Sequence, residues 1–172
     1  MVPSGMRDPS ASGEAAPHTE TLELTRADIG FSAAHFSIIE GQPERLHGHN
    51  YTVSLRVSGG VREDGTVVDF QALKEVLRTA CAGLHERTLL PARNPLLHVR
   101  RESGSVSVEV LQPARRYLFP EEDVRLLPVD NTTCECLAAH LLAAVRAHLG
   151  DAPLRLTLSV AELPGQGATV AE

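Results

Sequence analysis

The sequence predicts an α+β domain in which strands near both ends of the chain enclose two helices. Apolar and polar residues alternate over 50–57 and 154–160. Apolar residues recur at helical spacing over 70–84, and a second helical stretch follows the capping residues at 130–133 and runs to 149. Alternation with a period of two is typical of a half-buried strand, whereas spacings of three and four are typical of an amphipathic helix. The predicted order is strand, strand, helix, hairpin, helix, strand, strand.

The first two strands lie on either side of a loop. Residues 21–31 have strand character, and residues 50–57 are rich in strand formers. Gly41 and Pro43 mark the loop between them. Strands joined by such a loop can pair antiparallel.

The middle of the chain contains a helix followed by an insertion. Asp69 is the expected N-cap of a helix over 70–84, after which Pro91 and Pro95 break the chain. Residues 105–110 alternate, and residues 116–119 could return as a second strand. We therefore predict an inserted hairpin, within an insertion at about 97–128 of a single domain spanning 21–172.

The C-terminal part begins with residues whose side chains can cap a helix, at 130–133. The helix runs to Leu149 and ends at Gly150. A strand over 154–160, a turn over 162–167 and a short strand over 168–170 complete the domain.

Composition limits the class of protein. A chain of 172 residues corresponds to one domain, and a net charge of −6 with six aromatic residues argues against a nucleic-acid surface. No apolar run has the length of a membrane span. Residues 1–20 are expected to form a disordered tail rather than a secretory signal. Cys81, Cys134 and Cys136 lack CxxC spacing, so we expect a reduced, cytoplasmic protein.

Three histidines are the most informative residues. His47 and His49 would point to the same face of a strand, and His35 ends the preceding strand pattern. Three neutral imidazoles are a ligand set for a catalytic zinc ion, which keeps a fourth position open. The alternative is that these histidines bind no metal, and are either surface residues or partly buried residues with a hydrogen-bond partner. A histidine-x-histidine pair also opens cupin metal sites, which add a glutamate a few residues later, but residues 50–57 contain no acid.

The motifs together resemble a known family, the 6-pyruvoyl-tetrahydropterin and 6-carboxy-tetrahydropterin synthases, which have the tunnelling fold (T-fold). The matching runs, in the family's order, are Phe31-Ser32-Ala33-Ala34-His35, Leu46-His47-Gly48-His49-Asn50-Tyr51, Val68-Asp69-Phe70-Gln71-Ala72-Leu73-Lys74, Asn131-Thr132-Thr133 and Glu162. The resemblance implies an antiparallel four-stranded sheet with two helices on one face. The hairpin at 103–128 is an insertion relative to shorter members.

The resemblance also implies a site. It places zinc on His35, His47 and His49 and a pterin on Glu162, whose carboxylate would accept hydrogen bonds from the 2-amino group and N3 of the ring. Thr132 and Thr133 match positions that help to hold the pterin, although both could simply cap a helix. Glu162 could be a solvated turn residue. The family assembles as hexamers from two trimers with sites at subunit interfaces, so Glu162 could also serve a neighbour's metal.

Two departures from the family pattern bear on catalysis. The usual cysteine before the histidine pair is missing, and Glu44 resembles the glutamate that replaces it in a subset linked to folate synthesis. A loop glutamate paired with Arg45 in solvent is the alternative. The family's Leu-Asp-His is here Leu84-His85-Glu86, so His85 or Glu86 could act as acid or base, or could be a solvated pair.

The resemblance thus implies a zinc-dependent lyase that acts on dihydroneopterin or its triphosphate, by retro-aldol cleavage of the side chain or by phosphate elimination. Arg45, Arg87 and Lys74 are candidates to bind a triphosphate. The product branch, for folate, the deazapurine queuosine or a biopterin, stays open. The alternative is a non-catalytic pterin-binding homologue that has lost the cysteine and the acid–histidine dyad.

Overall fold

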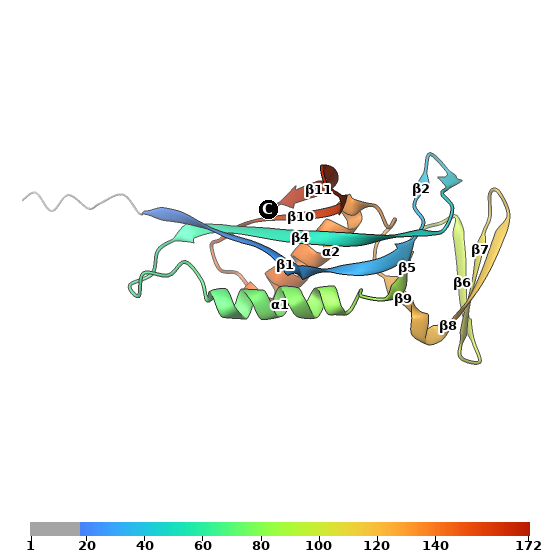
Figure 1. Ribbon diagram of the computed structural model, residues 1–172, viewed down its shortest axis with the longest axis horizontal. Coiled ribbons are helices and arrows are strands. Elements are labelled where there is room, and N and C mark those ends of the chain that lie inside the picture. The colour runs from blue at the N-terminus through green and yellow to red at the C-terminus, as the bar shows by residue number, and fades with distance from the viewer. Residues whose placement is uncertain (1–17) are drawn as a thin grey trace, which may run out of the picture.

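The computed structural model describes residues 18–172. The predicted disordered tail therefore lies outside the described residues up to position 17, but its last two positions already belong to the first strand, which begins at Thr19. Figure 1 shows one main sheet, two helices and a small separate sheet at one end.

The main sheet has six strands in the order β11-β10-β4-β1-β5-β9. Their bounds are β1 Thr19–His35, β4 His47–Gly60, β5 Arg87–Pro91, β9 Val124–Leu127, β10 Arg155–Leu163 and β11 Gln166–Ala171. The first four strands of this order are antiparallel neighbours, as the predicted four-stranded sheet requires. The sheet is nevertheless larger than predicted, because β5 and β9 extend it in parallel from β1.

The two extra strands are short and lack alternation. Thr88, Leu89 and Leu90 are all buried, as is typical of a parallel strand covered on both faces. A short apolar run ending in Pro91 carries no period that distinguishes a strand from a loop. This is why the sequence did not predict them.

The helices form as predicted, with small shifts at their ends. Helix α1 (Phe70–Ala82) is capped by Asp69, whose Oδ1 accepts hydrogen bonds from the backbone amides of Gln71 and Ala72. Helix α2 (Cys134–Leu149) is capped by Thr133 and followed by Gly150. In the described part of the chain, neither helix combines the length and the apolar character needed to cross a membrane.

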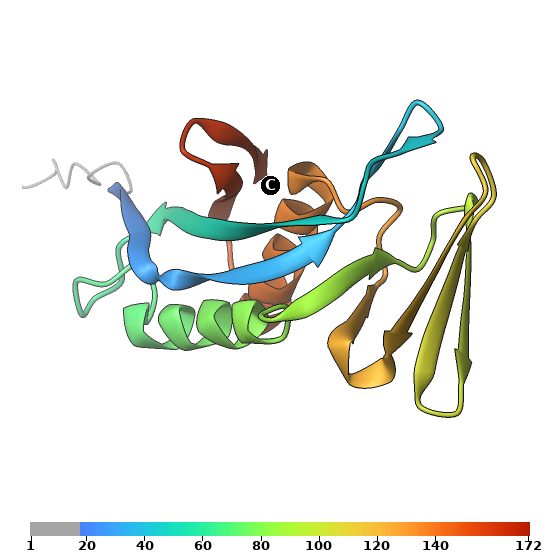
Figure 2. The ribbon, with the colours of Figure 1, turned by 45° about the vertical axis from the view of Figure 1, so that its right-hand side comes forward.

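The main core lies between the helices and one face of the sheet. Tyr51, Val53, Leu55 and Val57 alternate with exposed or half-buried residues along β4 and enter one apolar cluster with Leu77, Leu141 and other helix residues. Because both helices contribute to this cluster, they cover the same face; Figure 2 shows them side by side against the strands.

The insertion is a three-stranded sheet rather than the predicted hairpin. Its strands are β6 (Leu97–Glu102), β7 (Ser105–Val110) and β8 (Arg115–Pro120), and a short 3₁₀ helix, Glu121–Asp123, leads into β9. The missed strand, β6, lies at an edge and is rich in charged residues, so it shows no clear alternation. Ser103 and Gly104, both with positive φ, turn it into β7.

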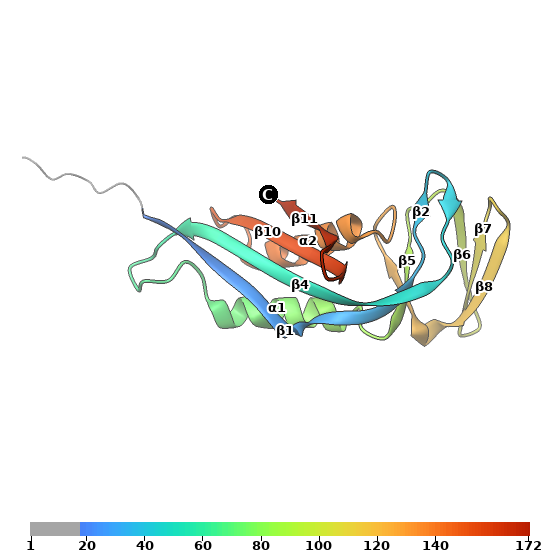
Figure 3. The same ribbon diagram turned by 45° about the horizontal axis from the view of Figure 1, so that its top comes forward.

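A second apolar cluster, here called the end cluster, packs this small sheet onto the domain. It consists of Phe36, Ile38, Leu90, Leu97, Val106, Val108 and Val110. Strands β2 (Ile38–Ile39) and β3 (Gln42–Pro43) form a short hairpin between β1 and β4. Figure 3 shows this hairpin beside the small sheet, at the end of the molecule away from the start of β1.

Candidate metal site and pocket

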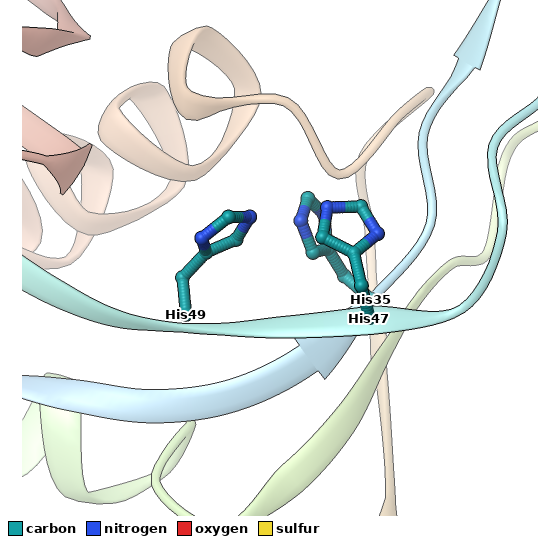
Figure 4. Close-up of side chains that lie close together, drawn as sticks. All are labelled: His35, His47 and His49. Carbon is teal, nitrogen blue, oxygen red and sulfur yellow. The ribbon is translucent and has the colours of Figure 1, made fainter.

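The pairing of β1 with β4 brings three histidines together. His35 lies directly opposite His47, and Ala33 lies opposite His49, so all three imidazoles project from one face. Their ligand atoms lie within 4.8 Å of one another (Figure 4). The three residues predicted as metal ligands therefore form one cluster that could hold a metal ion.

Gly48 allows the two strands to approach at this point. A Cβ atom at Gly48 would lie 3.0 Å from the carbonyl oxygen of Ala33 on β1, which is tighter than ordinary contact. The close approach of the strands therefore favours glycine between the two histidines.

Backbone carbonyls fix the orientation of two of the imidazoles. Nδ1 of His35 lies 3.0 Å from the carbonyl oxygen of Thr132, and Nδ1 of His47 lies 2.7 Å from that of Arg45. Because a carbonyl oxygen only accepts, each Nδ1 carries the proton and leaves Nε2 with a free lone pair. Metal-ligating histidines are commonly held in this way.

The Nε2 atoms of His35 and His49 are buried and have no hydrogen-bond partner. A buried nitrogen without a partner is costly unless an ion, a water molecule or a ligand meets it. Burial, together with the neighbouring His47, lowers the pKa of His35 and so favours the neutral form that binds metal. The donor set and its unpaired atoms thus fit a cation.

Three carboxylates, those of Glu44, Glu135 and Glu162, share a pocket of about 440 Å³ with the triad. Glu162 Oε2 lies 3.5 Å from Nε2 of His49 in the same chain, without a hydrogen bond between them. Glu44 lines the same pocket, and its Oε2 accepts a hydrogen bond from the backbone amide of Ser37 at 3.0 Å. Glu44 is therefore bound to the main chain and forms no ion pair with Arg45 among the described residues.

Thr132 and Thr133 lie at the start of α2, in different environments. Thr132 is fully buried, and its hydroxyl donates to the carbonyl oxygen of Phe36 at 2.9 Å, so its side chain lies behind the triad. Thr133 caps α2 and lines the pocket. Beside them, the amide of Asn131 exchanges two hydrogen bonds with the backbone of Ile38, which joins this segment to the β2–β3 hairpin.

His85 and Glu86 are not brought to the triad. They are exposed, 52% and 79% for their side chains, and His85 Nδ1 accepts from the amide of Ser32. Glu86 lines a second pocket, of about 460 Å³, together with Gly48 and Asn50. Gly48 and Asn50 alternate with His47 and His49 along β4. Most of this second pocket therefore lies on the face of β4 opposite the triad.

Residues outside the predicted set also reach the pocket with the triad. Cys134 lies there, with Sγ 3.9 Å from Glu162 Oε2, and burial followed by the charge of Glu162 raises its pKa to about 11. Ser37 holds Glu44. Neither stood out in the sequence, because a single cysteine in a helical pattern and a serine in a loop carry no positional signal.

The lining of this pocket contains Glu44, Glu135 and Glu162 but no lysine or arginine. Of the cations considered for a triphosphate, Arg87 lines the second pocket, and Lys74 lies over the ring of Phe70. Arg45 contributes its carbonyl to His47. Within one chain the pocket is therefore acidic.

Comparison with known proteins agrees with this geometry. The model of the family described as 6-pyruvoyl tetrahydropterin synthase matches residues 23–172. A putative 6-carboxy-5,6,7,8-tetrahydropterin synthase of Methanocaldococcus jannaschii is 33% identical over 156 residues, which cover 86% of this chain and 93% of the relative. The 6-carboxy-5,6,7,8-tetrahydropterin synthase of Bacillus subtilis is 40% identical over 78 residues, 44% of this chain and 50% of that protein.

Solved structures are similar over most of the chain. The 6-pyruvoyl tetrahydropterin synthase of Plasmodium falciparum superposes with a TM-score of 0.84 at 30% identity and covers 90% of this chain and 98% of its own. The Plasmodium vivax enzyme gives the same score and coverage at 28% identity. Further structures of the P. vivax enzyme replace a glutamate, described as a catalytic residue, by alanine or cysteine.

Proposed function

This chain belongs to the 6-pyruvoyl tetrahydropterin synthase family, and we propose on that basis that it is a zinc-dependent lyase acting on the side chain of dihydroneopterin or a close relative. The observation that carries the proposal is the shared pocket: three histidines whose ligand atoms lie within 4.8 Å, with Glu44 and Glu162 beside them. Three histidines with an open fourth position are typical of catalytic zinc. When bound, zinc would stabilise negative charge that develops on a substrate oxygen.

Glu44 is proposed as the general base. Its carboxylate lines the pocket, and Ser37 engages only its Oε2, so Oε1 can accept a proton from a side-chain hydroxyl of the substrate. Loss of the proton from the hydroxyl on the second side-chain carbon would let its bond to the first carbon break in a retro-aldol step. The second carbon would leave as the carbonyl of glycolaldehyde, and the electron pair of the broken bond would pass to the first carbon, which is conjugated with the C6–N5 double bond of the ring. The protonated Glu44 would then return its proton to the first carbon. The catalytic glutamate of the Plasmodium vivax enzyme supports this role.

Glu162 is proposed to anchor the pterin ring. Its carboxylate binds the side chains of Gln166 and Cys134 and keeps acceptor capacity for the 2-amino group and N3 of a pterin. Thr133 lines the same pocket and is proposed to contact the ring, whereas Thr132 orients His35. Glu162 would anchor a pterin that is bound at the metal site of its own chain.

His85 and Glu86 are proposed to act on a neighbouring subunit's pocket. They lie away from the triad of their own chain, and the family resemblance implies sites between subunits of a hexamer. A homohexamer, made as a dimer of trimers, would bring the second pocket of one chain toward a partner.

The acidic lining favours an unphosphorylated substrate. A triphosphate would need cations that the pocket of one chain does not supply, and a neighbour's second pocket would add Arg87 only together with the acids Glu86 and Asp123. We therefore propose dihydroneopterin rather than its triphosphate, and retro-aldol cleavage rather than phosphate elimination. Such a reaction releases 6-hydroxymethyl-dihydropterin and glycolaldehyde, which suits the folate branch.

The test is to incubate the zinc-loaded protein separately with dihydroneopterin and its triphosphate and to identify the products by mass spectrometry. Release of 6-hydroxymethyl-dihydropterin from dihydroneopterin supports the proposal. A second candidate, a non-catalytic pterin-binding homologue, is favoured by the exposed His85–Glu86 pair. Tight pterin binding without turnover, with zinc present, would establish that candidate instead.

A further inference from the structure

One side chain of the small sheet reaches the loop that carries Glu44. Arg115, the first residue of β8, donates from Nη1 to the carbonyl oxygens of Pro43 and Glu44, at 3.1 and 2.7 Å. Among the described residues its guanidinium forms no ion pair. The insertion is thereby hydrogen-bonded directly to the main chain of the proposed base.

Three consecutive carbonyls of this loop are bound. Those of Pro43 and Glu44 accept from Arg115, and the next, of Arg45, accepts from Nδ1 of His47. Ser37 binds Glu44 from the other side, through its amide at 3.0 Å and its carbonyl at 2.9 Å. The loop that orients both Glu44 and His47 is therefore fixed between Ser37 and Arg115.

The strand that carries Arg115 rests on packed side chains. Tyr117 of β8 stacks on Phe36, with ring centroids 5.3 Å apart, and Phe119 packs on the end cluster. Phe36 directly follows the histidine ligand His35. The strand that carries the guanidinium therefore packs against the segment that follows the metal ligand His35.

We infer that Arg115 is a positioning residue, and that the insertion acts through it to hold Glu44 and His47 in place for the reaction. This inference rests on the proposed function for its catalytic part. A charged donor forms stronger hydrogen bonds than a neutral one, and Nη1 of Arg115 carries two N–H groups, one for each of the two neighbouring carbonyls. A displacement of a base by about 1 Å can lower the rate roughly a hundredfold.

The matched pair of variants is Arg115→Ala and Arg116→Ala. Arg116 is the next residue along β8, faces the other side of the small sheet and pairs with Glu109. With Arg115→Ala we expect kcat to fall about tenfold while KM changes less than about threefold, because substrate binding is retained. Arg116→Ala should keep wild-type values, and Arg115→Lys should restore part of kcat, because lysine keeps a charged donor but lacks the planar guanidinium that holds Nη1 between the two carbonyls.

Amide hydrogen exchange tests the same contact without turnover. The amides of Ser37 and Glu44 should exchange at least about tenfold faster in Arg115→Ala, because the variant loses both hydrogen bonds from the charged Nη1, and at the wild-type rate in Arg116→Ala. If Arg115→Ala does not fold, Arg115→Gln provides the same comparison.

The outcomes separate this inference from the proposed function. Unchanged exchange in Arg115→Ala, or faster exchange with wild-type kcat, overturns the positioning role. If the zinc-loaded wild type turns over no pterin, the proposed function and the catalytic part of the inference both fail. The exchange data then still decide whether Arg115 holds the loop.

Discussion

Nδ1 of His35 donates a hydrogen bond to the carbonyl oxygen of Thr132, 3.0 Å away, and so joins the end of β1 to the segment before α2. The hydroxyl of Thr132 returns a bond to the carbonyl oxygen of Phe36, at 2.9 Å. Two adjacent residues of β1 and its extension are thus held by one threonine. The unprotonated Nε2 of His35 is left to face the pocket.

His49→Ala should remove metal binding. The triad would keep two imidazoles, and loss of a direct ligand is expected to weaken affinity by more than the roughly 10–100-fold that outer partners contribute. Metal content after dialysis, measured by elemental analysis, checks this. His98→Ala, an exposed histidine of β6, is the control and should bind metal as the wild type does. Equal metal in both variants would contradict the site.

Glu44→Gln should lower turnover while metal content is unchanged. General base catalysis contributes about 10²–10⁴-fold, and an amide cannot take the proton. The control is Glu40→Gln at the tip of the β2–β3 hairpin, an exposed carboxylate of the same loop that does not line the pocket. Product formation followed by mass spectrometry distinguishes them, and a wild-type rate in Glu44→Gln would remove Glu44 from the mechanism.

Glu162→Gln should weaken pterin binding by about 10–100-fold, because a charge-assisted pair of hydrogen bonds is replaced by neutral ones. Calorimetric titration of a pterin into the zinc-loaded protein measures this. Glu135→Gln removes a charge from the same pocket without a contact to a histidine ligand and should have a smaller effect. Equal losses would mean that pocket charge, not the anchor, determines affinity.

Cys134 should react slowly with iodoacetamide at neutral pH. Its pKa, raised to about 11 by burial and by Glu162, leaves only about one thousandth of the thiol ionised at pH 8. Because the thiolate is the nucleophile, the rate should rise about tenfold per pH unit between 8 and 10. Mass spectrometry of the Cys134 peptide measures it, and a pH-independent rate would show that the thiol is already ionised.

Gly48→Ala should destabilise the fold and disturb the triad. The added Cβ would meet the carbonyl oxygen of Ala33 at 3.0 Å and push β1 from β4, at a cost of about 1–3 kcal/mol. Gly60→Ala, at the other end of β4, meets no atom within 4 Å and is the control. Urea unfolding measures both; equal stability would mean that the strands adjust freely.

Local patterns predicted the four antiparallel strands, both helices and the triad. Alternation along β4 sets which face is buried, and the spacing of His47 and His49 sets the face they share. The sequence could not predict β5, whose buried run lacks a period, or the edge strand β6, in which charged residues predominate.

The supporting contacts of the site were also beyond the sequence. Arg115 and Glu44 are far apart along the chain and meet only because the insertion packs on Phe36. Thr132 matches a pterin-holding position by motif, yet its hydroxyl turns to a backbone carbonyl behind the triad. Such placements depend on tertiary packing, which no local pattern encodes.

Along the chain the main core ends at Ala33 of β1 and the end cluster begins at Phe36, so His35 lies between the two clusters. An ion bound by His35 would therefore clamp two separately packed parts of the molecule at their seam. We expect the loaded protein to melt in a single cooperative step. Without the ion, the small sheet should unfold at a lower temperature than the rest of the protein. The availability of metal would then determine whether the molecule unfolds in one step or in two.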